Sequence, residues 1–373
     1  MGVKNNDLGK RTTAFRGQQG VSGKEEVWHT ATISRVVNTN PWAELLGSDN
    51  YTANATSTSR PSARLEIIAV GGGGASDMPT QPSPGLLASQ GGFTIARYSI
   101  PKTTTLEYFV GEGGLGGSPG PGAGGASYGP NANSQGGGGS GYSQYPPAST
   151  YGGGGGGGMT GVCVATFSHA NALVIAGGGG GAKYGNEGGP TDKGWGGHGG
   201  GATAGNGTDG EGTHTNSAGT GGSNPTSAGG SGGEDQGGQN SWGGSAFAGG
   251  NNRSSNVNTI AYGGGGGGGG YYGGGSGGSS NTSGGQNSGG AGGGTGFFST
   301  ASPPAWTYVP SPTVERNYLG MGYPGYTGPT DTGALGPYPL GSGKDHPQIA
   351  PLLPTSNYGA GGKDGILIIN YYS

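Results

Sequence analysis

Short runs of β-branched, aromatic and aliphatic residues recur along the chain from residue 62 onward. They are rich in the residue types that favour strands, and none shows the apolar period of an amphipathic helix. We therefore expect an all-β fold with essentially no α-helix, in which the runs form one small β-sandwich or jelly-roll-like core. The last run is placed to close a sheet beside the earliest strands. The predicted strands are 64–70, 93–100, 105–110, 161–168, 172–176 and 365–372.

Most of these runs are joined directly to glycine tracts. Four glycines follow Val70, five follow Ala176, seven follow Tyr151 and eight follow Tyr262. Glycine makes up 100 of the 373 residues, far above its usual share of about 7%. The glycine segments, roughly 111–160, 177–250 and 263–296, are expected to emerge from one end of the core as a bundle.

The glycine tracts must be stabilised by their backbone if they are ordered. Fixing a glycine in a regular element costs roughly 0.5–1 kcal/mol more than fixing an alanine, and glycine has no side chain to bury. The threefold polyproline II helix points its unpaired N–H and C=O groups outward, and without Cβ atoms such helices can approach and pair. We therefore expect a packed bundle of polyglycine-II helices. Glycine as loop filler between ordinary strands is the alternative, and the broken glycine period at 114–120 excludes collagen.

Residues 1–60 differ from the rest of the chain. They contain few glycines and several basic residues, and 26–37 alternates loosely as a strand or strand pair. We interpret 1–60 as a segment for virion attachment or oligomerisation, with Trp28, Arg35 and Trp42 as candidate contacts. Residues 61–373 form the second predicted domain. Within it, 297–358 is a long excursion rich in proline and tyrosine, and a loop of that length is usually functional or an arm on a neighbour.

Charge and hydropathy exclude several classes of partner. The net charge is −3 and the pI about 5.9, which gives no electrostatic footprint for nucleic acid. No stretch is long and apolar enough for membrane insertion, and the N-terminus lacks the apolar region of a signal peptide. The single cysteine, Cys163, lies in a strand-like run and is expected to be a buried thiol. These features suit a virion part that is assembled in a host cytoplasm and released by lysis.

No catalytic or metal-binding pattern stands out from the glycine background. Gly-x-Ser-x-Gly occurs around Ser231 and Ser276, but neither serine lies between a strand and a helix as a nucleophile elbow requires. The acidic residues are scattered and the histidines show no ligand spacing. We therefore predict no enzyme activity, no cofactor and no metal. A metal on a trimer axis, held by His198 or His214, is the remaining alternative.

Tyrosine and tryptophan are the candidate recognition residues. The chain has 19 tyrosines and 5 tryptophans but only 7 phenylalanines, and Tyr and Trp combine rigid contact area with a polar group. In the alternative interpretation, Trp195 and Trp242 cap or wedge between glycine helices, and Tyr371 and Tyr372 close the sheet. The candidate receptor-binding residues are Tyr142, Tyr145, Tyr151, Trp195, Trp306, Tyr308, Tyr323 and Tyr326.

The segment Asn171–Ala182, a short apolar strand followed by a glycine tract, resembles the glycine-rich domains of bacteriophage tail-fibre and adhesin proteins. The glycine-rich extracellular domain of anaplastic lymphoma kinase is similar in pattern. The resemblance covers about 62–373 and implies polyglycine-II helices beside a β-sandwich, with binding by side chains and loops at the exposed end of the bundle. The kinase domain has disulfides and a signal peptide, which this chain lacks, so the phage proteins are the better match.

The resemblance leads to ranked functional hypotheses. The first is a tail-fibre or tail-tip adhesin that contacts a host-surface glycan or outer-membrane protein, docked to other virion proteins through residues 1–60. The second is a non-adhesive decoration such as a head fibre, neck or capsid protein. The third is an extracellular ligand-binding module. A homo-oligomer is expected, and a trimer is the usual state of fibres.

Overall fold

The computed structural model shows an all-β protein built from several antiparallel sheets. In the part of the chain that it describes, the only helical element is the 3-10 turn η1 (His169–Asn171), and no helix there is long and apolar enough to cross a membrane. The described residues are 28–34, 62–75, 89–101, 106–116, 124, 127–128, 138–141, 152–184, 194–210, 217–224, 227–234, 241–252, 263–280, 288–301, 307–308, 316–318, 362 and 364–372.

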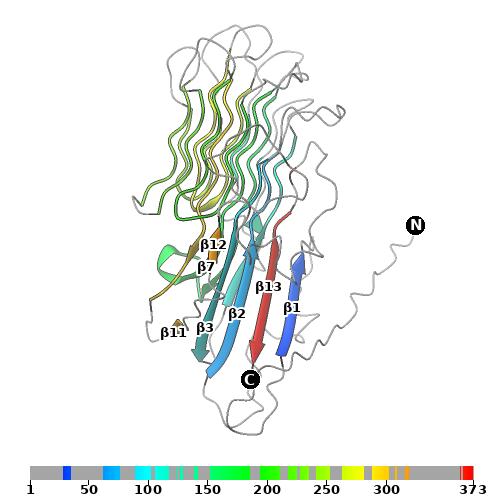
Figure 1. Cartoon of the computed structure of the whole chain (residues 1–373), viewed down its shortest axis with the longest axis vertical. Coiled ribbons are helices and arrows are strands. Elements are labelled where there is room, and N and C mark those ends of the chain that lie inside the picture. The colour runs from blue at the N-terminus through cyan, green and yellow to red at the C-terminus, as the bar shows by residue number, and fades with distance from the viewer. Residues whose placement is uncertain are drawn as a thin grey trace, which may run out of the picture.

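The first sheet joins the two ends of the chain. Its strands are β1 (Trp28–Ser34), β13 (Ile366–Tyr372), β2 (Ser62–Val70) and β3 (Phe93–Pro101), in that spatial order, with the short β11 (Thr307–Tyr308) and β12 (Arg316–Tyr318) pairing on β3. Every pair is antiparallel. The prediction that the last strand closes a sheet beside the earliest strands is confirmed, since β13 lies between β1 and β2 (Figure 1).

The second sheet has the strand order β10 (Phe297–Phe298), β7 (Ala172–Ala176), β6 (Thr160–Val164), β4 (Leu106–Gly111) and β5 (Ser127–Tyr128). A separate hairpin pairs β8 (Ala246–Phe247) with β9 (Gly270–Tyr272). The short strands β10, β11 and β12 fall within the 297–358 excursion, where the sequence showed no strand period.

The predicted strand 161–168 is wrong in its second half. The strand ends at Val164, and Ala165 turns the chain with a φ of 62°, a left-handed conformation that a strand does not contain. Asn171 stabilises this turn, because its Nδ2 donates hydrogen bonds to the backbone oxygen and the Oγ1 of Thr166, at 3.0 and 3.1 Å. The turn reverses the chain so that β7 pairs with β6.

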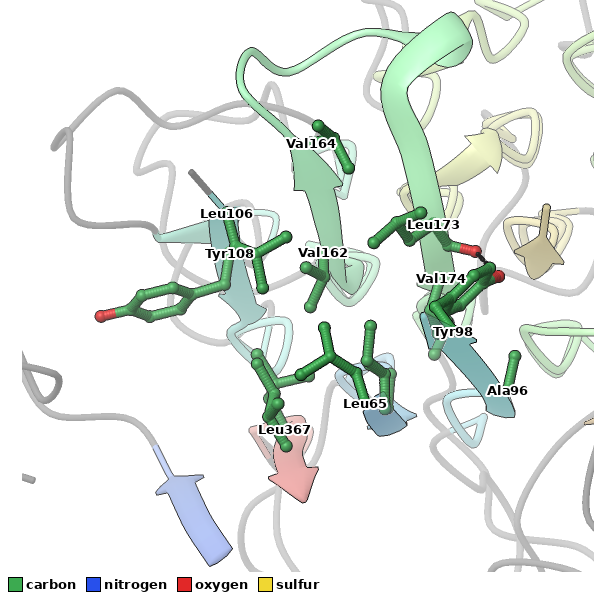
Figure 2. Packing of buried hydrophobic residues seen from close by; sticks show 14 of the residues in the cluster. Leu65, Ala96, Tyr98, Leu106, Tyr108, Val162, Val164, Leu173, Val174 and Leu367 are labelled. Carbon is green, nitrogen blue, oxygen red and sulfur yellow. Dashed lines mark hydrogen bonds between the residues drawn. The ribbon is translucent and has the colours of Figure 1, made fainter. Parts of the chain in front are cut away.

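The two sheets pack face to face across one hydrophobic core (Figure 2). Alternation along β2 decides which side chains enter it: Leu65, Ile67 and Ala69 face the second sheet, while Ile68 and Val70 belong to a separate cluster. Figure 2 shows Leu65 and Leu367 from the first sheet directed towards Val162 of the second. The first sheet contributes Leu65, Ile67, Ala69, Ala96, Tyr98, Ile100, Leu367 and Ile369; the second contributes Leu106, Tyr108, Val110, Val162, Val164, Leu173, Val174 and Ala176.

The glycine tracts continue from the strands at one end of this core. Figure 1 shows them as wavy traces running side by side beyond the upper ends of β2, β3 and β13. We call the described residues of these tracts the glycine array. It comprises 71–75, 89–92, 112–116, 138–141, 152–158, 177–184, 194–210, 217–223, 227–234, 241–245, 248–252, 263–269, 273–280 and 288–296.

Candidate binding surface on the glycine array

Backbone hydrogen bonds hold the glycine array together, and they repeat every third residue. In segment 177–184, residues 178, 181 and 184 donate to the carbonyls of 269, 266 and 263. Residues 179 and 182 donate to 72 and 75, and residues 180 and 183 donate to 197 and 194. Consecutive residues of one segment therefore face three different neighbours. The same segment has antiparallel partners, as at 263–269, and a parallel partner at 71–75.

This close packing requires glycine. A Cβ atom built on Gly266 would overlap the carbonyl oxygen of Gly139, and one on Gly267 would overlap that of Gly274. In both cases the obstructing atom belongs to the backbone of another segment, which has its own hydrogen bonds. Any side chain at such a position would force the segments apart.

Short polar side chains complete the hydrogen bonding at several borders of the array. Thr208 Oγ1 accepts the N–H groups of Gly194 and Trp195, at 2.8 and 2.7 Å. Asp209 Oδ1 accepts the N–H of Ala218 at 2.8 Å. Asn206, Thr220, Asn251 and Asp364 accept backbone N–H groups in the same way, from Gly221, Ser231, Ser140 and Gly113. The polar residues between the glycines thus act as acceptors for backbone N–H groups, in most cases those of a neighbouring segment.

Two large apolar side chains of the array are exposed. The exposed fraction is 59% for Leu115 and 58% for Trp242. The backbone of Trp242 is nevertheless fixed, because its carbonyl oxygen accepts hydrogen bonds from both the N–H and the Oγ–H of Ser276, at 3.1 and 3.0 Å. An indole on a fixed backbone loses little conformational entropy on binding, which suits a contact residue.

The two tryptophans of the glycine array differ in the exposure of their side chains. Trp195 is half-buried, and its backbone N–H and C=O are both bonded to Thr208. The interpretation of Trp242 as a wedge between glycine helices is wrong, since its side chain lies on the surface. Sequence reasoning proposed Trp195 as the contact and did not select Trp242 or Leu115. Both tryptophans have glycine-rich surroundings in the sequence, so no local signal distinguishes them.

Most other predicted contact residues lie outside the described part of the chain. Trp28 and Tyr308 are described only as members of strands, where Trp28 pairs with Tyr372 on β13 and Tyr308 with Tyr98 on β3. They belong to the first sheet and not to the glycine array. The predictions outside the described residues are Tyr142, Tyr145, Tyr151, Trp306, Tyr323, Tyr326, Arg35 and Trp42, together with the alternative metal ligand His214.

A second aromatic group covers the outer face of the second sheet. Tyr271 stacks between His169 and Phe297, with both ring centroids 4.0 Å away. Phe167 and Phe247 complete the group over the buried residues Phe109, Cys163 and Ile175. The faces of these rings pack against one another. The cluster is therefore a satellite hydrophobic core that attaches the β8–β9 hairpin to the sheet.

Burial is the main cause of the pKa shifts of the titratable groups in this cluster. Desolvation lowers the pKa of His169, while its hydrogen bond to the carbonyl oxygen of Tyr271, at 2.7 Å, opposes the shift. Desolvation also raises the pKa of the Cys163 thiol to about 12. Cys163 is fully buried and therefore stays protonated and unreactive in the folded protein, as the sequence predicted.

No group of three or more His, Cys, Asp or Glu side chains within the described ranges is placed to hold a metal ion. The two serines in Gly-x-Ser-x-Gly contexts are part of the array: Ser276 is buried, and its Oγ donates to the carbonyls of Trp242 and Asn251. Comparisons with protein-family models and with curated proteins found no match to this chain.

Proposed function

We propose that the segments of the glycine array are polyglycine-II helices mounted on a β-sandwich of the jelly-roll-like kind. The repeat of hydrogen-bond partners at every third residue of segment 177–184 supports threefold helices. The mixture of parallel and antiparallel neighbours is what two-dimensional packing of such helices allows. The shared core of the two sheets supports the sandwich, and the chain crosses between the sheets after β3 and again after β10.

We propose further that this protein is a virion structural protein of a bacteriophage, a tail-fibre or tail-tip adhesin that recognises the host surface. The observation that carries the proposal is a backbone-bonded array, joined to the core at one end, that displays the exposed Trp242. Because backbone groups stabilise the array, its surface side chains are free to vary with the receptor. The receptor would be a host-surface glycan or an outer-membrane protein, bound reversibly and without catalysis.

In this proposal, residues 1–60 dock the protein to other virion components, and the assembled protein is a homo-oligomer within the virion. The net charge of −3 gives no electrostatic reason to propose nucleic-acid binding, and we propose no membrane insertion. The Pro/Tyr-rich excursion 297–358 would contact the host, together with the aromatic residues proposed from the sequence. A non-adhesive decoration on the head or neck is the competing function.

The test is gold-labelled antibody against residues 297–358, applied to intact particles of the virus that encodes the chain and viewed by electron microscopy. Label at a fibre or tail tip is the expected result. Label on the head or neck would overturn the adhesin proposal in favour of a structural decoration.

Competition for adsorption tests the same proposal at residue level. Purified protein added in excess is expected to block adsorption of the virus to its host. The Trp242→Ala variant should block at least about tenfold less well, since anchoring aromatics commonly contribute 2 kcal/mol or more. Ser245→Ala changes a neighbouring exposed residue of the same segment and serves as the control. If Trp242→Ala competes as well as the unchanged protein, Trp242 is not a receptor contact.

A further inference from the structure

Three neighbouring segments of the glycine array form one exposed face. Segments 241–245 and 248–252 are joined by a tight turn and run antiparallel, and 138–141 lies on the far side of 248–252. Backbone hydrogen bonds connect the first two segments to 273–276 and the last two to 264–267. These two inner segments are buried, so the first three share one outer face of the array.

One exposed side chain from each segment lies in a row across this face. The hydroxyl of Ser276 donates to the carbonyl oxygens of both Trp242 and Asn251, at 3.0 and 2.9 Å, so these two residues lie side by side on adjacent segments. Asn251 is joined in turn to Ser140, whose N–H donates to Asn251 Oδ1 at 2.8 Å. Trp242, Asn251 and Ser140 are all exposed, and we call them the Trp242 row.

The hydrogen bond to Ser140 fixes the orientation of the Asn251 amide. The amide oxygen accepts the Ser140 N–H, so the NH₂ group, which carries two donors, is directed away from that bond. Within the part of the chain that the structure describes, no hydrogen bond is found from Asn251 Nδ2, from the indole N–H of Trp242 or from the Ser140 hydroxyl. The row thus presents hydrogen-bond donors beside an exposed aromatic ring.

The surroundings of the indole leave its faces open. Gly243 follows Trp242 and is exposed, and Gly250 lies next to Trp242 on the facing segment, so neither neighbour adds a side chain. Among the described residues, no aromatic ring stacks on Trp242. A flat ligand can therefore lie against the ring and still reach the neighbouring polar groups.

The charge of this face restricts the ligand. Segments 138–141, 241–245 and 248–252 contain only Gly, Ser, Ala, Asn and the one Trp. The adjoining segment 227–234 adds the exposed, negative Glu234, which disfavours an acidic ligand. A protein partner is also a poorer match, because hot-spot aromatics in protein interfaces lie in well-packed surroundings that exclude water, whereas this ring stands alone among polar groups.

We propose that the Trp242 row binds a neutral saccharide. The C–H face of a pyranose ring stacks on the indole, whose π face is negative. Saccharide hydroxyls both donate and accept, so they bond to the Asn251 NH₂ group and to the Ser140 hydroxyl. This inference rests on the proposed role of Trp242 as a receptor contact, and it commits to a glycan in place of an outer-membrane protein.

The first test is binding of the fluorescently labelled full chain to cells of the host, after periodate or proteinase K treatment. Periodate cleaves the vicinal diols of saccharides and should abolish binding, whereas proteinase K should leave it intact. Loss after both treatments would place the saccharide on a protein. Binding that survives periodate would overturn the saccharide ligand and leave the adhesin proposal standing. A lack of binding to untreated cells would overturn the adhesin proposal, and this inference with it.

The second test locates the site with polysaccharide extracted from the host surface and separated by anion exchange into neutral and acidic fractions. The full chain should bind the neutral fraction, and Trp242→Ala should bind it at least about tenfold more weakly. Asn251→Asp keeps the acceptor for the Ser140 N–H but removes the NH₂ donors. It should weaken binding about threefold to tenfold with an unchanged thermal midpoint.

Leu115→Ala is the matched control for these variants. It removes a similarly exposed apolar side chain from segment 112–116, which bonds to 71–75 and 152–158 and lies outside the Trp242 row. This variant should bind the neutral fraction as well as the unchanged protein does. Binding of the acidic fraction alone, or equal effects of Trp242→Ala and Leu115→Ala, would overturn the proposal.

Discussion

The hydroxyl of Tyr98 on β3 donates to the carbonyl oxygen of Leu173 on β7 at 2.6 Å, and so links the two sheets inside their shared core (Figure 2). The carbonyl oxygen of Ser299, 3.0 Å away, shares the same donor. Tyr98 is fully buried, so the three polar groups depend on each other and not on water. The chain thus places one polar side chain at the point where β3, β7 and the residues after β10 meet.

Tyr98→Phe is expected to lower the free energy of unfolding by about 1–3 kcal/mol, because it leaves the buried carbonyl oxygen of Ser299 without this donor, while that of Leu173 keeps the N–H of Ser299. Chemical denaturation monitored by circular dichroism measures the change. Tyr272→Phe is the control, since no hydrogen bond is found to the Tyr272 hydroxyl in the described part of the chain, and it should change stability by less than about 0.5 kcal/mol. Equal effects of the two substitutions would contradict the role assigned to Tyr98.

Gly266→Val should destabilise the array severely, because its side chain would overlap the backbone of segment 138–141. Overpacking typically costs about 1–3 kcal/mol and more where the backbone cannot move. The thermal midpoint and the yield of folded protein measure the effect. Unchanged stability would mean that the segments are not close-packed at this point.

The adjacent glycines Gly243 and Gly244 provide a matched pair of sites that tests the close packing of the segments. A Cβ on Gly244 would overlap the carbonyl oxygen of Gly273, whereas one on the exposed Gly243 meets only the carbonyl oxygen of Gly230, at 2.8 Å, with the next atoms 3.8 Å or more away. Gly244→Ala should therefore lower the thermal midpoint clearly more than Gly243→Ala. The reverse order would contradict the packing.

Thr208→Val removes the acceptor for two backbone N–H groups while keeping the shape of the side chain. We expect a loss of about 1–2 kcal/mol of stability, reduced from the fully buried case because Thr208 is half-exposed. Hydrogen exchange at Gly194 and Trp195 should become faster. Thr203→Val, at an exposed threonine nearby, is the control and should leave these amides unchanged.

Stability should fall with acidification through His169. Burial lowers the pKa of His169 in the folded state, so between that pKa and the ordinary value of about 6.5 the unfolded chain binds more protons. The free energy of unfolding therefore decreases as the pH falls through this interval. His169→Gln, which keeps a donor for the Tyr271 carbonyl, should be less stable at pH 8 and should lose less stability between pH 7 and 5. Parallel curves for the two proteins would contradict this assignment.

Cys163 should resist alkylation while the protein is folded. Burial raises the pKa of its thiol to about 12, so the thiolate that reacts is scarce and shielded at pH 8. Iodoacetamide labelling followed by mass spectrometry should be slow in buffer and rapid in denaturant. Rapid labelling in buffer would mean that the β6 region opens easily.

The sequence by itself determined most of the longer strands and, for several of them, the places where they end. The apolar runs at 172–176 and 365–372 match β7 and β13 to within a residue, because β-branched residues next to glycine are a strong local signal. It did not show that the strand after Thr160 stops at Val164, since the stop depends on Asn171 reaching back to Thr166. The sequence predicted that the last strand lies beside the earliest strands, but not that β13 lies between β1 and β2.

The neighbours of each glycine segment were decided by tertiary structure alone. One glycine tract offers the same N–H and C=O groups as another, so nothing in the sequence of 177–184 selects 71–75, 194–197 or 263–269 as partners. The exposed position of Trp242 and the half-buried position of Trp195 both follow from that choice of neighbours. Side chains carry local information about strands, whereas backbone hydrogen bonds between glycines carry none, and only the packing of the whole array fixes which surface is presented.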